Sequence, residues 1–409
     1  MIVRTTAARI AAMGLLGGAG LLGGCNSPGG DTTAQAPDTS GNSASASATG
    51  SGAMGAKLRI AVIPKGLTHS FWQAIRRGAE QAGGEMNAEI TWVGPANESD
   101  GTKQQQQIVE DQVTKKVDGI VIAPNNKTAL VPAIDKAAAA GVTIVIADSD
   151  ADTKNRISYV ATDNEKGGAM AADRIWKLTG GKGPIGMVPV QANSESTEKR
   201  EQGFEKRIAE LSKGSVKVIR SQFGESDRKK SMAAAQDMLQ AHKDMLAIFG
   251  PNESSAVGAM NAARSAGLLS KIKIVGFDTP PILVEAVKKG EVDSIVVQNP
   301  FAMGYEGVKA IVEHKAGKMV KERIDTGVGL LTTENINKPE SSPTSTATMA
   351  LKATADTVTA STSIKSSRFD RDKSAPRTQR QASLSTARSA MKKLSHSITP
   401  ATAANAIQR

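Results

Sequence analysis

Short runs rich in Ile and Val alternate with longer helix-like stretches over residues 57–333. The first run is LRIAVI at 58–63, and the stretch after it, residues 71–83, reads as a helix. Further strands are predicted at 89–93, 119–123 and 142–147, and further helices at 103–113 and 129–140. This repeated β–α unit is typical of a parallel sheet covered by helices.

A second series of the same unit follows after a loop. It opens with a helix at 167–178, then has predicted strands at 184–188, 215–220, 245–249 and 272–277 and helices at 197–211, 228–241 and 255–266. Two series predict an α/β fold with two Rossmann-like lobes, each built on a parallel-rich sheet. Ligands of open parallel sheets bind beyond the carboxyl ends of the strands, so the residues just after each strand are the first candidates for function.

Polar or aromatic residues follow several of the predicted strands in both series. They are His69, Phe71, Trp72, Asp148, Asn252 and Asp278. Phe, Trp and Tyr make up only 3% of the chain, so two aromatic residues in succession after the first strand are informative. The candidate site is therefore a constellation drawn from both series rather than one local motif.

The first 25 residues read as an export signal. Arg4 and Arg9 supply positive charge, residues 10–22 are apolar or small, and the segment ends in LGGC at 22–25. The apolar stretch is too short for a comfortable membrane span. Its ending resembles the lipobox of bacterial lipoproteins, which implies that Cys25, the only cysteine, carries an acyl anchor. A cleaved secretory signal with an incidental cysteine is the alternative.

Two low-complexity segments flank the alternating region. Residues 26–56 are mostly Gly, Ser, Ala and Thr, and we expect a disordered tether. From Lys338 onward the chain has twelve Lys or Arg against four Asp or Glu, which accounts for +8 of the net charge of +11. The basic charge belongs mainly to this tail and does not indicate nucleic-acid binding by the head. We expect a disordered tail, or a translated out-of-frame or fused segment; a basic arm that touches anionic envelope polymers or lipid is the alternative.

Three runs in the alternating region carry a family resemblance. They are IAVIPKGLTHSFW at 60–72, DGIVIAP at 118–124 and VGFD at 275–278. In order and spacing they resemble the periplasmic sugar-binding proteins of the ribose-binding type, the type I solute-binding proteins of ABC transporters, over about residues 57–335. Sugar-responsive repressors share these runs, but they need an amino-terminal helix-turn-helix where this chain has LGGC and the tether. The resemblance implies the type I periplasmic binding protein fold, whose two lobes close about a three-strand hinge.

The resemblance assigns ligand contacts in the first lobe. It implies that Phe71 and Trp72 stack on the apolar face of a sugar ring and that His69 bonds a hydroxyl. It also implies that Asp148 accepts hydrogen bonds from neighbouring hydroxyls. Structural roles stay open: core aromatics for Phe71 and Trp72, a helix cap or solvent-facing side chain for His69, and a turn cap for Asp148. Ribose binders have Arg at the position of Ser149, so the identity of the sugar is open.

In the second lobe the resemblance implies ligand contacts from Arg200, Asn252, Asp278 and Gln298. A solvated helix charge is the alternative for Arg200, and loop-stabilising side chains are the alternative for the other three. The third aromatic residue of the family falls near Ser226, which predicts looser contact with the ring on that side. Carboxylates, amides, one guanidinium and aromatic faces together suit a neutral polyol.

The resemblance also implies where the chain crosses between the lobes. The expected organisation is an export signal at 1–25, a tether at 26–56, lobe one at 57–162 plus 299–328, lobe two at 163–298 plus 329–336, and a tail at 337–409.

Nothing in the sequence indicates catalysis. The four His residues are scattered, and GGKG at 180–183 precedes a strand, which is wrong for a dinucleotide-binding turn. We therefore expect no catalytic residue, metal, cofactor or nucleic-acid partner. The resemblance implies a lipid-anchored, periplasmic-side monomer that hands a monosaccharide or related polyol to an ABC transporter permease. A sensory protein that presents its ligand to a membrane receptor, or the same fold with a non-sugar solute, stays open.

Overall fold

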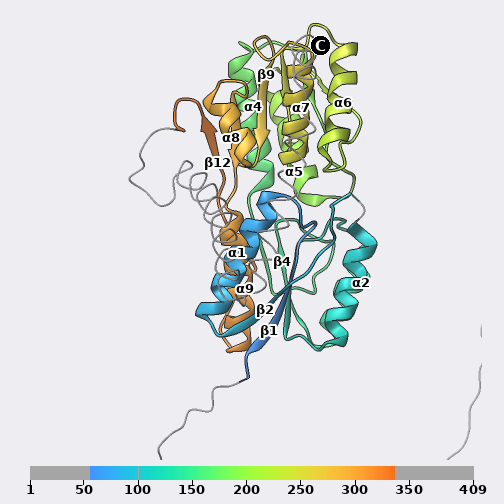
Figure 1. Cartoon of the computed structure of the whole chain (residues 1–409), viewed down its shortest axis with the longest axis vertical. Helices are drawn as coiled ribbons and strands as arrows, with labels where there is room; N and C mark the ends of the chain where they lie inside the picture. The colour runs from blue at the N-terminus through green and yellow to red at the C-terminus, as the bar shows by residue number, and fades with distance from the viewer. Residues whose placement is uncertain (1–55, 100, 337–409) are drawn as a thin grey trace, which may run out of the picture. The chain divides into compact units, whose positions relative to one another are not determined.

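The computed structural model describes residues 56–99 and 101–336. The predicted export signal with Cys25, the tether up to residue 55 and the basic tail lie outside the described residues. Within the described part, the strands form two separate six-stranded sheets. Figure 1 shows these sheets with helices packed around them.

The first sheet has the strand order β11-β5-β4-β3-β1-β2, and each neighbouring pair in it is parallel. Its strands are β1 (Leu58–Ile63), β2 (Ala88–Trp92), β3 (Gly119–Ile122), β4 (Thr143–Ala147), β5 (Ser158–Ala161) and β11 (Arg323–Asp325). The helices that pack with it are α1 (Ser70–Glu85), α2 (Gly101–Thr114), α3 (Val131–Ala139) and α9 (Pro300–Lys315).

The second sheet has the order β12-β10-β9-β8-β6-β7, and only its β10–β12 pair is antiparallel. Its strands are β6 (Ile185–Met187), β7 (Val218–Arg220), β8 (Ala247–Phe249), β9 (Lys273–Phe277), β10 (Ser294–Val297) and β12 (Gly329–Thr332). The helices that pack with it are α4 (Asn164–Leu178), α5 (Glu195–Leu211), α6 (Arg228–Ala241), α7 (Glu253–Ser265) and α8 (Pro281–Lys288).

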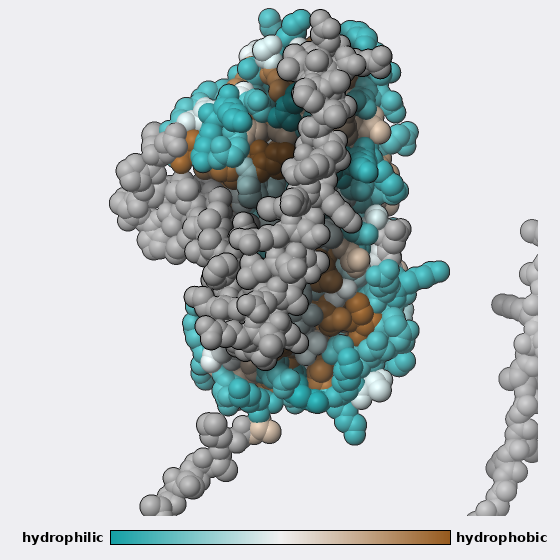
Figure 2. All heavy atoms as spheres, viewed as in Figure 1, coloured by the Kyte–Doolittle hydropathy of each residue, from teal (hydrophilic) through white to brown (hydrophobic). Residues whose placement is uncertain are grey.

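Both faces of the first sheet are buried, which explains its unbroken apolar runs. In β1, Ile60 and Val62 pack with α1 and α9, whereas Ala61 and Ile63 pack with α2 and α3. Successive side chains of a strand point to opposite faces, so a strand covered on both sides has to be apolar at every position. The outside of the protein differs: Figure 2 shows hydrophilic residues over much of the visible surface of the described residues.

Five consecutive strands of each sheet have the same topology, and the sixth strand is parallel in the first sheet and antiparallel in the second. Strand order 2-1-3-4-5 in the first corresponds to 7-6-8-9-10 in the second, so β4 and β9 are equivalent strands. The chain passes between the sheets after β5, after β10 and after β11. The predicted α/β fold with two parallel-rich sheets is confirmed. Among the elements of the structure that the prediction lacked are β5, α8, β10, α9 and β11.

Beside each sheet, glycine allows two helices to pack closely against each other. A Cβ on Gly78 of α1 would lie 2.0 Å from the carbonyl oxygen of Phe301 in α9. A Cβ on Gly168 of α4 would lie 2.0 Å from the carbonyl oxygen of Arg200 in α5. Only glycine allows such approaches, so these positions set how near α9 lies to α1 and α5 to α4.

We expect Gly78→Ala and Gly84→Ala, both in α1, to change stability in opposite directions. The Gly78 change forces α1 and α9 apart and should lower the free energy of unfolding by about 1–3 kcal/mol. A Cβ on Gly84 meets nothing within 4 Å. That change should therefore raise the free energy of unfolding by about 0.5–1 kcal/mol through helix propensity. Urea denaturation of both variants tests this, and equal effects would contradict the close helix contact.

Candidate functional site

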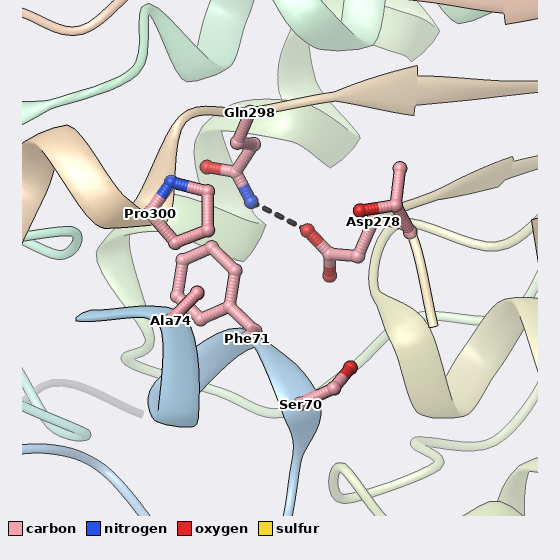
Figure 3. A pocket seen from close by; sticks show the side chains of 7 residues that line it. Ser70, Phe71, Ala74, Asp278, Gln298 and Pro300 are labelled. Atoms are coloured by element: carbon pink, nitrogen blue, oxygen red, sulfur yellow. Dashed lines mark hydrogen bonds between the residues drawn. The ribbon is translucent and has the colours of Figure 1, made fainter. Parts of the chain in front are cut away.

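A cavity collects residues from the carboxyl ends of strands in both sheets. All eight residues singled out in the sequence line it: His69, Phe71, Trp72, Asp148, Arg200, Asn252, Asp278 and Gln298. Five further lining residues were not predicted: Lys65, Glu98, Ser196, Thr197 and Glu253. A neighbouring cavity shares Phe71, Asp278 and Gln298 with it (Figure 3).

Asp148 and Asp278 occupy equivalent places in the two sheets. Asp148 directly follows β4 and Asp278 directly follows β9, the equivalent strand. Their φ angles are 62° and 71°, in the left-handed region that only a few per cent of non-glycine residues adopt. Both are nearly buried, at 3% and 7% exposure. Such backbone strain at a buried charge is characteristic of functional positions.

Asp278 is held by two donors and keeps acceptor capacity. Its Oδ1 accepts from Gln298 Nε2 at 2.7 Å, and its Oδ2 accepts from the Glu253 backbone N–H at 3.1 Å. Burial raises the pKa of Asp278 from 3.8 to about 6, against the opposing effects of the Arg200 charge and the Gln298 hydrogen bond. The Gln298 carbonyl oxygen Oε1 is buried and has no hydrogen-bond partner within residues 56–99 and 101–336.

Arg200 lines the cavity and is held by Asn164 of α4 and by Pro251, just before α7. Its Nε donates to Asn164 Oδ1 at 2.8 Å, and its Nη1 donates to the Pro251 carbonyl at 3.0 Å. Its guanidinium carbon sits 4.0 Å from the centre of the Phe277 ring. The remaining nitrogen, Nη2, is 3.8 Å from Asp148 Oδ1, too long for a hydrogen bond. Arg200 thus keeps donors available beside Asp148.

His69 is held between two protein partners. Its Nδ1 lies 2.7 Å from Glu98 Oε1, and its Nε2 lies 3.1 Å from Ser254 Oγ. The Ser254 hydroxyl donates to the Ser226 carbonyl at 2.7 Å, so it accepts from His69. Both ring nitrogens therefore donate, which requires the imidazolium form.

The pKa of His69 agrees with this hydrogen-bond pattern. Burial alone would lower that pKa, but the charge of Glu98 and the hydrogen bond to it outweigh burial and raise the pKa from 6.5 to about 9. The predicted bond from His69 to a ligand hydroxyl has no counterpart in this arrangement, because both nitrogens already have protein partners.

Glu98 also fixes the aromatic wall. Its Oε1 accepts from Trp72 Nε1 at 2.7 Å, and the Phe71 and Trp72 rings meet edge to face at 4.9 Å. Trp72 is 3% exposed and belongs to the core packed on the first sheet, so it is a core residue that also lines the cavity. Phe71 is partly exposed and lines both cavities, and Figure 3 shows its ring beside Pro300.

Asn252 is the N-cap residue of α7 and lines the cavity from the second sheet. Its Oδ1 caps the helix by accepting from the Ser255 N–H at 2.9 Å, and its Nδ2 donates to Ser226 Oγ at 3.0 Å. Ser226 therefore supports Asn252 and supplies no aromatic face. Phe223, three residues earlier, is 45% exposed and does not line the cavity.

The lining residues that were not predicted differ in how far the sequence could have revealed them. Lys65 comes two residues after β1, so the rule that directs attention to strand ends applies to it. Glu98 lies in the loop after β2, and its role depends on the approach of His69 and Trp72, which sequence spacing does not reveal.

Among the described residues, no group of His, Cys, Asp or Glu suits a metal ion. None of the described helices has the length and apolar character needed to cross a membrane.

Comparison with known proteins gives consistent matches. A family model described as "Periplasmic binding protein domain" matches residues 60–319. The D-ribose/D-allose-binding protein of Pseudomonas aeruginosa is 28% identical over 288 residues, which cover 68% of this chain and 89% of that protein.

Two solved structures of ABC transporter solute-binding proteins from Agrobacterium vitis also match. The one with bound D-fucose is 35% identical with a TM-score of 0.66, and the match covers 69% of this chain and 97% of that chain. The one bound with α-D-tagatopyranose is 31% identical with the same TM-score and the same coverage.

The His69–Glu98 pair predicts a pH-dependent contribution to stability. Because the pKa of His69 is raised from 6.5 to about 9, the contribution is complete below pH 6.5 and is lost as pH rises through 9. His69→Asn should therefore cost on the order of 2–3 kcal/mol of unfolding free energy at pH 6 and much less at pH 10. Urea denaturation at both pH values measures this.

The control for that measurement is His314→Asn, which removes an exposed histidine of α9. An equal loss of stability at pH 6 and pH 10 in the His69 variant would mean that the imidazolium pair does not form.

Proposed function

The chain belongs to the family of periplasmic binding proteins, and we propose that it binds a neutral monosaccharide or related polyol and delivers it to an ABC transporter permease. It would act by binding alone, without catalysing a reaction. A ligand-presenting sensory protein would use the same cavity, and the site favours neither role over the other.

The observation that carries the proposal is the set of buried polar groups left incompletely paired in the cavity. Gln298 is only 3% exposed, yet its Oε1 has no hydrogen-bond partner in the described part of the chain. The Asp148 carboxylate has only long contacts, 3.4 Å to Lys65 and 3.8 Å to Arg200. An unpaired buried polar group costs about 1–3 kcal/mol, so these acceptors call for hydroxyl donors from a ligand.

Donors stand beside these acceptors. Arg200 Nη2 makes no hydrogen bond with any of the described residues, and Asn252 Nδ2 uses one of its two hydrogens on Ser226. A sugar hydroxyl both donates and accepts, so adjacent hydroxyls can pair with Asp148 and Arg200 together. An aliphatic or purely accepting ligand would leave one kind of group unpaired.

The charges around the cavity support an uncharged ligand. Four cations balance four carboxylates there, counting Arg228, which pairs with Glu253 from outside the lining. They are Lys65, His69, Arg200 and Arg228 against Glu98, Asp148, Glu253 and Asp278. A charged solute would leave a net charge in a site shielded from water, which is costly.

The aromatic wall suits a ring with an apolar face. Phe71 and Trp72 are the only Phe, Trp or Tyr side chains among the cavity-lining residues, so we propose stacking on one side of the ring. The relatives point to the same ligand class: one is named for D-ribose and D-allose, and two structures hold D-fucose and α-D-tagatopyranose. Pentoses and hexoses are therefore the first solutes to test.

We further propose that the protein acts as a lipid-anchored monomer on the periplasmic side of the membrane. The support is the LGGC ending at 22–25 and the Gly- and Ser-rich stretch after it. An acyl anchor on Cys25, joined to the binding head through this stretch, would keep the head near a permease without embedding it.

A thermal-shift screen of the purified protein against pentoses, hexoses, polyols and amino acids tests the ligand class. A bound solute raises the melting temperature because it stabilises only the folded state. We expect a shift with a sugar, and roughly a 100-fold weaker affinity after Asp278→Ala, because that change leaves Gln298 and the ligand hydroxyl unpaired.

The matched control is Asp237→Ala, which removes an exposed carboxylate of α6 and should bind like the unchanged protein. Shifts with amino acids alone would rule out the sugar assignment, and full affinity in the Asp278 variant would place the ligand elsewhere.

Cys25→Ser tests the anchor separately. In a bacterial host that processes lipoproteins, we expect the unchanged protein in the detergent phase of a Triton X-114 partition and the variant in the aqueous phase. Aqueous partition of both forms would contradict lipidation.

A further inference from the structure

A second cavity, the side cavity, lies next to the one proposed to hold the sugar ring, the ring cavity (Figure 3). The two share Phe71, Asp278 and Gln298. The side cavity adds four lining residues of its own: Ser70, Ala74, Thr279 and Pro300. Because the two cavities have walls in common, a short arm on a sugar ring can pass Phe71 and enter the side cavity.

One wall of the side cavity is apolar. It consists of Phe71, Ala74 and Pro300, of which Ala74 and Pro300 are buried. Ala74 lies three residues after Phe71, on the same face of α1, and Figure 3 shows the Phe71 ring beside Pro300. The methyl side chain of Ala74 takes up little of the space there. This wall suits contact with a CH₂ group.

The rest of the lining offers polar atoms. Gln298 Oε1 is buried without a hydrogen-bond partner among the described residues. Its Nε2 donates to the Asp278 carboxylate at 2.7 Å, and the reverse orientation of the amide would set two acceptors against each other. The Ser70 hydroxyl donates to Glu253 at 3.2 Å, so its oxygen can still accept, and Thr279 supplies another hydroxyl. A neutral hydroxyl pairs with these atoms, whereas the Asp278 carboxylate disfavours an anionic arm.

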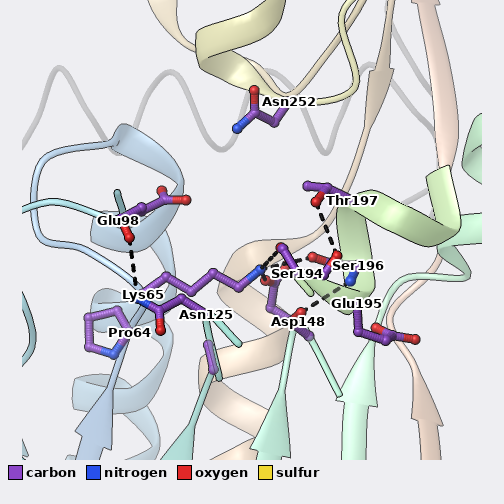
Figure 4. A network of polar contacts seen from close by, with 12 residues as sticks. Pro64, Lys65, Glu98, Asn125, Asp148, Ser194, Glu195, Ser196, Thr197 and Asn252 are labelled. Atoms are coloured by element: carbon purple, nitrogen blue, oxygen red, sulfur yellow. Dashed lines mark hydrogen bonds and ion pairs between the residues drawn. The ribbon is translucent and has the colours of Figure 1, made fainter. Parts of the chain in front are cut away.

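Lys65 fills a part of the ring cavity that the side cavity does not share. Its Nζ donates to Ser194 and Ser196 at 3.0 Å each and lies 3.4 Å from Asp148, as Figure 4 shows. An ammonium has three N–H donors, so all three face protein acceptors. An arm placed there would displace these bonds, whereas an arm in the side cavity would give Gln298 Oε1 the donor it lacks.

We propose that the side cavity takes the exocyclic hydroxymethyl group of a hexose whose pyranose ring occupies the ring cavity. The CH₂ group would contact Phe71, Ala74 and Pro300, and the hydroxyl would donate to Gln298 Oε1 and accept from Thr279. A pentopyranose lacks this arm and leaves the Gln298 oxygen unpaired, so the site selects hexoses over pentoses. The inference rests on the proposed function, because the ring has to be bound next door.

Calorimetric titration with matched sugars tests the selection. In each of the pairs D-ribose and D-allose, L-arabinose and D-galactose, and D-xylose and D-glucose, the hexose is the same pyranose ring with a hydroxymethyl group added. In the pair that binds most tightly, we expect the hexose to bind about tenfold or more tightly than the pentose. The 6-deoxy form of that hexose keeps the carbon and loses the hydroxyl, and it should bind with intermediate affinity.

A variant locates the arm. Thr279→Leu puts a bulkier apolar side chain at a partly exposed lining residue and removes its hydroxyl. It should weaken the hexose about tenfold or more and leave the pentose within about threefold, because only the hexose reaches the side cavity. The matched control is Thr114→Leu at an exposed position of α2, which should change neither affinity. The comparison of sugars on the unchanged protein does not depend on the folding of either variant.

The outcomes separate this inference from the proposed function. If none of the six sugars binds, both fail. If sugars bind but each hexose binds no more tightly than its pentose, the ring cavity stands and the hydroxymethyl site is wrong. Equal weakening of hexose and pentose by Thr279→Leu would also overturn the site, because that residue would then act on the ring itself.

Discussion

Buried polar groups have to be paired, and this requirement governs the cavity between the two sheets. Parallel strands covered by helices on both faces leave room for polar side chains only at their ends. Two such sheets bring Asp148, Arg200, Asp278 and Gln298 together at 7% exposure or less. The protein satisfies part of this set, and a ligand rich in hydroxyls completes it.

The polar side chains of the cavity are held by protein partners, yet some of their atoms are left for a ligand. Asp278 and Gln298 bind each other, and Arg200 is held by Asn164 and by the Pro251 carbonyl, so their free atoms have fixed directions. Such preorganisation reduces the ordering cost of binding. Close contact of α4 with α5 at Gly168 supports Arg200 from behind, which links a packing constraint of the fold to the site.

The repeat of hydrophobic runs was sufficient to predict the two sheets, because continuous apolar strands have few other uses. It was insufficient for β5 and β10, which are four residues each and follow irregular segments. The start of α9 was more visible, since Asn299 caps the helix and Pro300 is its first residue. That signal was not used to predict the helix, and Gln298 beside it was singled out through the family resemblance alone.

The cavity residues were predicted from the strand-end rule and a family resemblance, and all eight gather in one place. The sequence did not reveal which side chains of the cavity pair with one another. The contact of Glu98 with both His69 and Trp72 joins residues 26 or more positions apart, and it decides the charge of the imidazole. Lys65 was overlooked because its partners Ser194 and Ser196 lie on the other sheet's side, 129 or more residues away.

The most direct test of the central claim is calorimetric titration of the protein with its best sugar and with the monodeoxy analogues of that sugar. If hydroxyls complete the pairing of buried groups, removing the hydroxyl that meets Asp148 or Gln298 leaves those groups unpaired. We predict that at least one analogue binds roughly 100-fold more weakly or worse. Binding of every analogue within a few-fold of the parent sugar would contradict the account.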